Sequence, residues 1–397
     1  SLDQGINNKW YNDLAVETVK LPGSMAENGK GNEVTLKTDW TGEIVDRSYF
    51  TEKRYEKYRQ PGNIKIPFWL KPVKYYKGVA WYQKKVELPS EWDGKNIILF
   101  LERPHWETTV FVNGKKAGTE NSLAVAHQYD ITDLLIPGKN LISIRIDNRV
   151  VVPVGINSHS ISDHTQSNWN GIAGDISLKA TSKVFIRDIK VYPDIQGKKA
   201  KIIVALSNKP AIPFKGEIVV QAESFNSGIS RKLKSMTVAA NTNSNELQIV
   251  IDYPMGNEIQ LWSEFAPSLY NLCVNLNGPK GELIDSMSED FGMREFKTKG
   301  TLFEVNGQQI FLRGTLECCI FPLTGYPPAD INSWLKVLQT FKDYGLNTVR
   351  FHSWCPPEAA FSAADRLGIY FQIECSSWAN SGTTIGDGGI IDEYIEL

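Results

Sequence analysis

The fold is decided by a stretch near the end of the chain that reads IFL at residues 310–312, DINSWLKVLQTFKDY at 330–344, NTVRF at 347–351, PPEAAFSAADRL at 356–367 and IYFQI at 369–373. The second segment has apolar residues three and four positions apart, which is the spacing of one helix face, and Gly345 follows it as a C-cap glycine does. The fourth segment opens with proline and is followed by Gly368, which is the usual asymmetry of a helix. The sequence therefore predicts the order strand, helix, strand, helix, strand, with parallel strands covered by helices.

Polar and reactive residues follow each predicted strand. They are Glu317, Cys318 and Cys319 after the first, His352, Trp354 and Cys355 after the second, and Glu374 and Cys375 after the third. In a β/α barrel the loops at the carboxyl ends of the strands form the active face. A small open α/β sheet with polar loops is the alternative, and the barrel is favoured because of the segments that precede this stretch.

Length and composition describe a multidomain globular chain. Its 397 residues suggest roughly two to four domains, and a hydrophobic content of 42% is ample for packed cores. A net charge of −2 argues against nucleic acid or an anionic membrane as a partner. No apolar run approaches the roughly 20 residues of a membrane span. Five cysteines are an odd number in a long chain, which argues against a disulfide scaffold.

Two β-rich blocks precede the deciding stretch. Strand signals in the first block fall at residues 81–88, 95–101, 108–112, 129–132 and 140–146, and in the second at 186–191, 200–207, 216–222, 247–251 and 270–276. Asn113-Gly114 is a favoured hairpin turn in the first block. Many short strands with turn signals between them are typical of sandwiches. We predict domains at residues 1–181, 182–297 and 298–397.

Several motifs of the last domain resemble one enzyme family. FEVNG at 303–307, FLRG at 311–314, GLNTVR at 345–350 and DRLGI at 365–369, followed by Glu374, resemble the start of the catalytic barrel of glycoside hydrolase family 2. That family includes β-galactosidases, β-glucuronidases and β-mannosidases. The resemblance implies a jelly-roll sugar-binding domain, an immunoglobulin-like sandwich and the N-terminal part of a (β/α)8 TIM barrel.

The implied activity is retaining, exo-acting hydrolysis of terminal β-linked sugars, with β-galactosidase as the first choice. β-Glucuronidase and β-mannosidase activity are alternatives within the family. A non-catalytic carbohydrate-binding or scaffold protein is the alternative from another class.

The expected catalytic pair is missing from the sequence. A retaining glycosidase needs two carboxyl groups about 5–5.5 Å apart, and the family carries both as glutamates on later barrel strands. No Asn-Glu pair follows Glu374, and a full barrel needs roughly 200–250 residues. We therefore expect the catalytic glutamates beyond Leu397, and an inactive N-terminal portion here. Two interpretations of Glu374 are open. It orients other groups, or it forms a replacement catalytic pair with Glu317.

The resemblance also implies residues that contact the substrate. Asp163 lies where β-galactosidase relatives carry an aspartate that reaches the sugar pocket from the first domain. Arg350 and His352 lie in the segment that matches the family's Arg-x-Ser-His-Tyr-Pro, but RFHSWC at 350–355 places the imidazole one position early. Trp354 and Glu374 complete the predicted set. Cys318 stands where relatives have a histidine, and these departures indicate a subfamily with its own substrate.

We predict neither a metal nor a cofactor. Cys318, Cys355 and Cys375 follow different strands and, with His352, offer soft ligands for zinc, but small semi-polar residues lining a pocket are the ordinary interpretation. The expected partner is an oligo- or polysaccharide, with a homo-oligomer left open and no nucleic acid. The chain begins Ser1-Leu2-Asp3, so no leader is visible, and the expected location is periplasmic or secreted, with the cytoplasm as the alternative.

Overall fold

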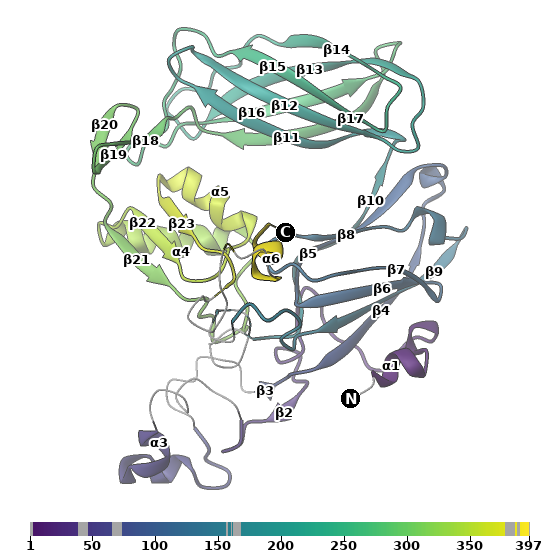
Figure 1. The fold of residues 1–397 in the computed structure, drawn as a ribbon, viewed down its shortest axis with the longest axis vertical. Coiled ribbons are helices and arrows are strands. Elements are labelled where there is room, and N and C mark those ends of the chain that lie inside the picture. The colour runs from purple at the N-terminus through teal and green to yellow at the C-terminus, as the bar shows by residue number, and fades with distance from the viewer. Residues whose placement is uncertain are drawn as a thin grey trace.

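The computed structural model describes residues 3–38, 47–65, 74–155, 158–159, 161, 168–377, 386 and 390–396. These residues form a mostly β-stranded molecule, in which one sandwich lies above another and a layer of strands and helices lies below the upper sandwich and beside the lower one (Figure 1). Asp163 falls outside the described residues. None of the described helices is long and apolar enough to cross a membrane.

The first sandwich consists of two antiparallel sheets of four strands. One sheet has the order β1 (Gly23–Ser24), β10 (Gly171–Thr181), β5 (Asn96–His105), β8 (His127–Asp130), and the other β4 (Val79–Glu87), β9 (Lys139–Asp147), β6 (Glu107–Val112), β7 (Lys115–Glu120). Alternate side chains of β5 are buried, as expected for a strand with one face toward a core. The predicted Asn113-Gly114 turn is confirmed, because both residues have positive φ, 51° and 79°, as a tight hairpin turn requires.

The region before and between these strands holds short elements in its described part. They are α1 (Gln4–Asn7), β2 (Asn32–Glu33), α3 (Ser48–Thr51) and β3 (Lys74–Tyr75), with β2 and β3 paired.

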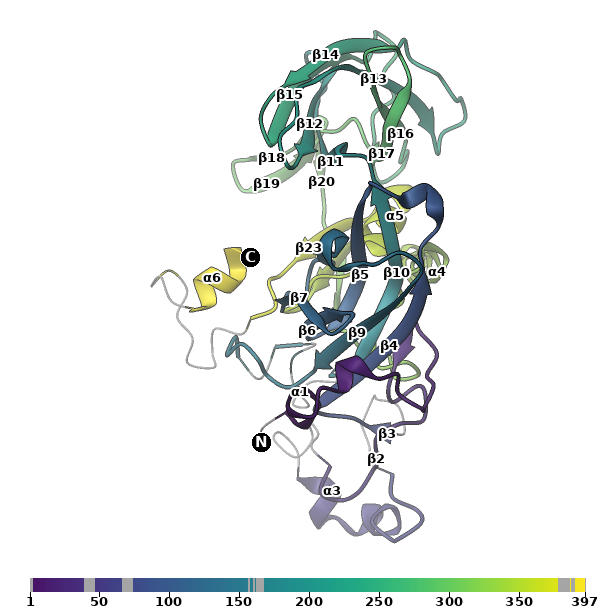
Figure 2. The same ribbon diagram turned by 90° about the vertical axis from the view of Figure 1, so that its right-hand side faces the viewer.

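The second sandwich packs a three-stranded sheet on a four-stranded one, around a separate apolar core. The sheets are β11 (Val184–Asp194), β12 (Lys199–Asn208), β15 (Glu246–Pro254), and β14 (Met236–Thr242), β13 (Phe214–Phe225), β16 (Leu269–Asn277), β17 (Leu283–Phe291). Strand β10 of the first sandwich leads directly into β11 of the second, and Figure 2 shows the two sandwiches one above the other.

The deciding stretch forms a parallel sheet in the order β21 (Gly314–Glu317), β22 (Thr348–Phe351), β23 (Tyr370–Ile373), with α4 (Ile331–Asp343) and α5 (Glu358–Leu367) as the connections. Both predicted helices are confirmed. The Asp330 side chain accepts the Ser333 N–H and so caps α4, and Gly368 ends α5 in the left-handed conformation, where glycine costs least.

The predicted first strand is wrong. Ile310 is the last residue of an antiparallel sheet of β18 (Phe296–Lys299), β19 (Leu302–Val305) and β20 (Gln308–Ile310), and residues 311–312 lie in no strand. Ile310 pairs with Phe303 there, and Phe311 is 75% exposed. The parallel strand begins only at Gly314, which pairs with Thr348. The apolar residues at 310–312 therefore precede the parallel sheet, and the parallel sheet itself starts with a less apolar sequence.

The parallel sheet has one covered and one open face. Val349 is fully buried in a cluster with Trp334 and Leu338 of α4 and with alanines of α5. On the opposite face Leu316, Arg350 and Gln372 are aligned in register across the three strands, and all three are exposed. Parallel sheets usually have both faces covered. Among the described residues, this sheet is covered on one face only.

Direct contacts fix the layer against both sandwiches. Arg103 of the first sandwich donates to the carbonyl oxygens of Leu123 and Ala124 and, across the junction, to those of Cys355 and Pro356. From the second sandwich side, Trp262 Nε1 donates to the Asp365 carbonyl at 2.7 Å, Arg294 pairs with the Asp365 carboxylate at 3.2 Å, and Asn347 Nδ2 donates to the Glu264 carboxylate at 2.5 Å. The carboxyl ends of the parallel strands are therefore held next to the first sandwich.

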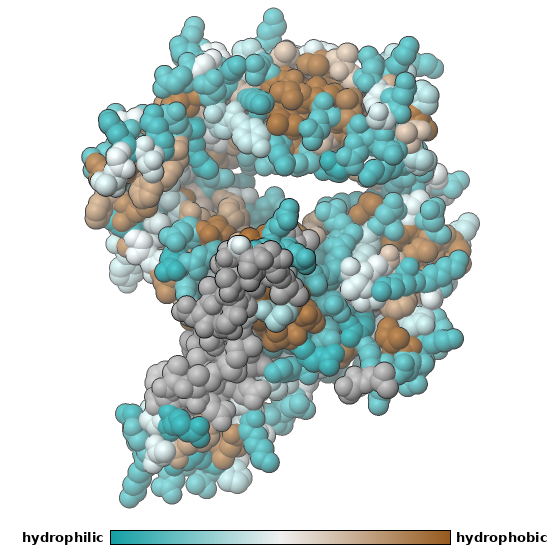
Figure 3. Space-filling view, in the orientation of Figure 1, coloured by the Kyte–Doolittle hydropathy of each residue, from teal (hydrophilic) through white to brown (hydrophobic). Residues whose placement is uncertain are grey.

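The visible face is largely hydrophilic. Figure 3 shows teal residues over most of it, with brown patches over the second sandwich and around the parallel layer. The last helix, α6 (Ile390–Glu396), returns to the first sandwich, where Tyr394 packs edge-on against the buried Trp106 at a ring separation of 6.2 Å.

Candidate functional site

The site is built on the turn that follows β22. The His352 N–H donates to the Glu317 carbonyl at 2.9 Å, which holds the end of β22 against the end of β21. Ser353 then adopts a positive φ of 52°, which is uncommon for a residue other than glycine, and its side chain is 2% exposed. This turn directs the chain away from the sheet at the edge where the strands end.

A charged pair lies at this edge. Arg350 donates through Nε at 2.6 Å and through Nη2 at 2.5 Å to one oxygen of Glu374, and the Ser353 N–H donates to the other oxygen at 2.7 Å. Desolvation opposes ionisation of Glu374, but the Ser353 N–H and the Arg350 guanidinium outweigh it and hold the pKa of this carboxyl below its ordinary value. Glu374 is therefore an ionised group that fixes both Arg350 and the turn.

The Glu317 carboxylate has hydrogen-bond partners different from those of Glu374. Its carboxylate accepts the N–H of Cys319 at 2.8 Å and that of Ile320 at 3.3 Å. Burial raises the pKa of Glu317 above its ordinary value in spite of these bonds. The carboxylate is thus engaged in shaping the turn after β21.

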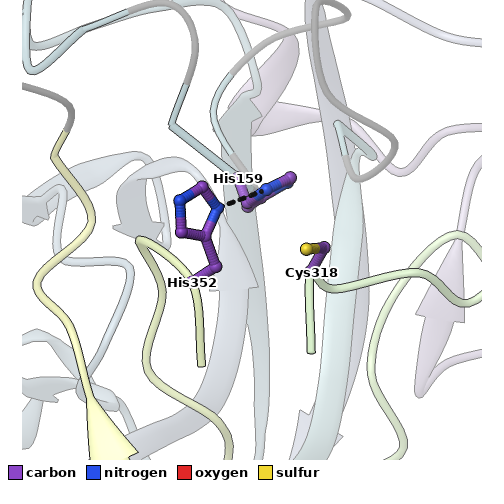
Figure 4. Close-up of side chains that lie close together, drawn as sticks. All are labelled: His159, Cys318 and His352. Carbon is purple, nitrogen blue, oxygen red and sulfur yellow. Dashed lines mark hydrogen bonds between the residues drawn. The ribbon is translucent and has the colours of Figure 1, made fainter. Parts of the chain in front are cut away.

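The first sandwich contributes a histidine from the loop between β9 and β10. His159 Nε2 lies 2.9 Å from His352 Nδ1, and the His159 N–H donates to Ser353 Oγ at 3.0 Å. Burial, together with the neighbouring His352, lowers the pKa of His159 to about 4, so the His159 imidazole is neutral at pH 7. Figure 4 shows His159 and His352 joined by this hydrogen bond, with the Cys318 thiol beside them.

The structure places the predicted residues in three groups. Arg350, His352 and Glu374 come together at the strand ends. Trp354 lies behind them, 2% exposed, with its ring packed edge-on against Phe351 at 5.2 Å and its Nε1 donating to the Glu317 carbonyl at 3.3 Å. Asp163 belongs to the undescribed segment of the loop that carries His159.

Sequence reasoning missed His159. The sequence signal for His159 was weak. His159 precedes Asp163 by four positions in the same Ser- and Asn-rich loop, and the family resemblance implies a sugar contact from that loop. Of the cysteines, only Cys318 joins the two histidines in the described residues. Cys355 lies at the Arg103 junction, where its thiol is 3.6 Å from the Pro356 carbonyl, and Cys375 is exposed.

Two sandwiches followed by a parallel β/α layer, with an ordered arginine, glutamate and histidine at the strand ends, define a modular chain of three structural parts. Comparison with known families agrees. The profile described as "Glycosyl hydrolases family 2, sugar binding domain" matches residues 4–182, and the profile "Glycosyl hydrolases family 2" matches residues 184–294. The chain belongs to glycoside hydrolase family 2.

Individual relatives are distant and longer. A protein from Formosa agariphila that carries a β-glucuronidase name is 27% identical over 317 residues, which are 78% of this chain and 36% of that protein. A β-galactosidase from Clostridium acetobutylicum is 24% identical over 78% of this chain and 33% of its own length. The crystal structure of Bacteroides uniformis β-glucuronidase aligns with 97% of this chain and 43% of that chain, at a TM-score of 0.68 and 19% identity, which is a likeness of fold. The chain spans about a third of the length of these curated relatives.

Proposed function

We propose that this chain is the N-terminal portion of a retaining exo-glycosidase that removes terminal β-linked sugars, with β-galactosides as the first choice of substrate. In this proposal residues 1–181 are a jelly-roll sugar-binding domain, 182–297 an immunoglobulin-like sandwich, and 298–397 the opening part of a TIM barrel. The catalytic acid/base and nucleophile glutamates belong to a part of the protein beyond Leu397. The chain by itself is then inactive.

The open face of the parallel sheet is the observation that carries the proposal. Leu316, Arg350 and Gln372 form an aligned, exposed row on that face, while the other face is buried against α4 and α5. In a β/α barrel the helices cover the outside, and the inward face is filled by side chains from further strands. A sheet covered on one side is what the first strands of such a barrel present.

The strand-end residues suit sugar recognition. The Arg350 side chain is 47% exposed although it is fixed by Glu374. Its N–H groups that do not bind Glu374 can therefore donate to hydroxyl oxygens of a sugar. His352 is half-buried beside Arg350, with Nδ1 2.9 Å from His159 Nε2. Pre-positioned donors of this kind orient a sugar without losing much side-chain freedom on binding. In the proposal Arg350 and His352 contact substrate, and Trp354 and Glu374 position them. The predicted sugar contact of Asp163 lies outside the described residues.

A neutral sugar is favoured over a uronic acid by the charge of the described site. A glucuronide carries a carboxylate, which calls for an unneutralised cation, and Arg350 is already paired with Glu374. β-Glucuronidase activity is the second candidate, because relatives and structural neighbours carry that name. An oligo- or polysaccharide substrate also favours a periplasmic or secreted location for the enzyme.

The test compares this chain with the protein encoded by the complete reading frame. Both are assayed with the nitrophenyl β-galactoside, β-glucuronide and β-mannoside. The expected result is turnover by the longer protein, highest with the galactoside, and none by residues 1–397. Sugar binding without turnover in both proteins would instead support a non-catalytic module, and higher activity on the glucuronide would overturn the choice of galactose.

The roles of individual residues are tested in the longer protein. Arg350→Lys and His352→Gln are each expected to reduce kcat/KM at least about tenfold. Each substitution removes a hydrogen bond to the substrate, which costs on the order of 1.5 kcal/mol, and about 1.4 kcal/mol corresponds to a factor of ten. His127→Gln, which changes a buried histidine of β8 whose hydrogen-bond partners are Ser122 and Thr108, is the matched control and keeps its kcat/KM. Unchanged kinetics in both site variants would remove these residues from the proposed subsite.

A further inference from the structure

Three soft ligand groups converge where the first sandwich meets the parallel layer. His159 comes from the loop between β9 and β10, Cys318 follows β21, and His352 follows β22. One ligand atom from each lies within 4.8 Å of the others, and Figure 4 shows the thiol turned toward the pair of imidazoles. His159 is separated along the chain by 159 residues from Cys318 and by 193 residues from His352. Only the tertiary fold therefore brings these groups together.

We propose that His159, Cys318 and His352 bind one zinc ion or a similar borderline-soft divalent cation. Imidazole nitrogen and thiolate sulfur are the donors that zinc prefers, whereas magnesium and calcium need oxygen ligands. No carboxylate oxygen belongs to the group in the described residues, so the donor set selects against the hard cations. The hydrolytic activity proposed above does not require this ion.

The spacing is close to that of a tetrahedral site. With Zn–N distances of about 2.0–2.1 Å and a Zn–S distance of about 2.3 Å, neighbouring ligand atoms lie about 3.3–3.6 Å apart. The facing nitrogens of His159 and His352 are 2.9 Å apart in the hydrogen-bonded state. An ion between them needs a separation of about 0.4 Å more, and the thiol, which lies within 4.8 Å of both rings' ligand atoms, has to approach by up to about 1.2 Å.

The surroundings support the ligands in the way that outer groups of a metal site do. The His159 backbone is fixed by its hydrogen bond to Ser353 Oγ, and the same Ser353 is fixed through its N–H by Glu374. His159 is 8% exposed, and its Nδ1 has no hydrogen-bond partner among the described residues. Ligation through Nε2, the nitrogen that faces His352, would leave Nδ1 as the protonated nitrogen of His159, so the support for the ligand comes from its fixed backbone.

Three protein ligands leave the fourth position of the ion open. A zinc ion bound by two neutral imidazoles and one thiolate carries a net charge of about +1, since the thiol proton passes to the solvent on binding. Arg350 and Glu374 cancel one another nearby. The open position therefore takes water, hydroxide or a sugar hydroxyl. The ion would also link the loop of the first sandwich to two strands of the parallel layer.

The experiment is a zinc titration of this chain, prepared without a polyhistidine tag and dialysed against a chelator. Competition with a chromophoric chelator measures the affinity, and substitution with Co²⁺ reports ligand type, because a bound thiolate gives a charge-transfer band in the near ultraviolet. The expected result is one ion per chain with that band. Cys318→Ser is expected to lose the band and to weaken zinc binding at least about a hundredfold, since even outer groups of metal sites contribute 10- to 100-fold.

Cys375→Ser is the matched control, because the exposed Cys375 also follows a parallel strand but lies outside the group; it keeps both band and affinity. His352→Gln is the second variant, and its loss of affinity decides the question if Cys318→Ser does not fold. Wild-type affinity in Cys318→Ser or His352→Gln, a cobalt complex without the thiolate band, or no zinc uptake by the wild-type chain would each overturn the proposal and leave a hydrogen-bonded pair of histidines beside a thiol.

Discussion

The buried imidazole of His127 makes the stability of the first sandwich depend on pH. His127 lies on β8 and is fully buried. Its Nε2 is 2.9 Å from the Ser122 carbonyl, which only accepts, so this nitrogen carries the proton, while Nδ1 accepts from the Thr108 hydroxyl at 2.6 Å. Burial is the main reason that the pKa of His127 falls from 6.5 to about 4, against a smaller opposite effect of the Ser122 hydrogen bond.

The sign and size of the effect follow from this shift. Below pH 6.5 the unfolded chain binds a proton at His127 and the folded chain does not until about pH 4, so stability decreases as the pH falls through this window. A shift of about 2.5 units corresponds to about 3 kcal/mol at full development, and about 2.5 kcal/mol of this is lost between pH 7.5 and pH 4.5.

His127→Gln keeps a donor for Ser122 and removes the titration. Urea unfolding of both proteins at pH 7.5 and pH 4.5, followed by tryptophan fluorescence, gives a double difference in which other titrating groups, including His159, cancel. We expect the variant to be less stable at pH 7.5, and to lose about 2.5 kcal/mol less than the wild type on acidification. Equal losses in the two proteins would refute the argument that His127 is held neutral by burial.

Three further substitutions test the junctions and the core. Glu374→Gln, which releases Arg350, is expected to cost about 2 kcal/mol because it removes charge-assisted hydrogen bonds; an unchanged melting temperature would contradict this. Arg103→Met leaves carbonyl groups on both sides of the junction unpaired and is expected to cost about 1–3 kcal/mol, with faster hydrogen exchange in the loop between β22 and α5 as the specific readout. Trp334→Ala empties a fully buried position of α4 and is expected to cost about 3–5 kcal/mol in thermal unfolding, whereas Tyr344→Ala, at an 82% exposed residue after the same helix, should stay within about 0.5 kcal/mol.

The elements that could be predicted are those whose signals are local. Helix α4 has its apolar face, its capping Asp330 and its terminal Gly345 within one continuous segment. Strand β17 was missed because only its last residue, Phe291, is buried, so no apolar alternation marks it. The run at 310–312 misled for the opposite reason, since Phe311 is apolar but exposed. Apolar letters report burial only where tertiary packing covers them.

The site divides in the same way. Arg350, His352 and Glu374 could be brought together from sequence because carboxyl ends of parallel strands meet at one edge, whatever the details of packing. His159 could not, because its contact with His352 joins positions 193 residues apart in the chain and depends on how the first sandwich docks on the layer. The contacts that make this docking include those of Arg103 with main-chain carbonyl oxygens of the layer, which carry no sequence signal.

The departures from the family motif are coupled through Ser353. The motif that the chain resembles has its histidine at the position of Ser353, one residue after His352. Here the Ser353 side chain is 2% exposed, because its hydroxyl accepts the His159 N–H while its own N–H is bound by Glu374. An imidazole has no room at that position while the loop of the first sandwich packs there, so a histidine that faces His159 has to come from position 352. The early histidine and the contribution of His159 are thus two parts of one rearrangement, and the Cys318 thiol lies within 4.8 Å of both imidazoles.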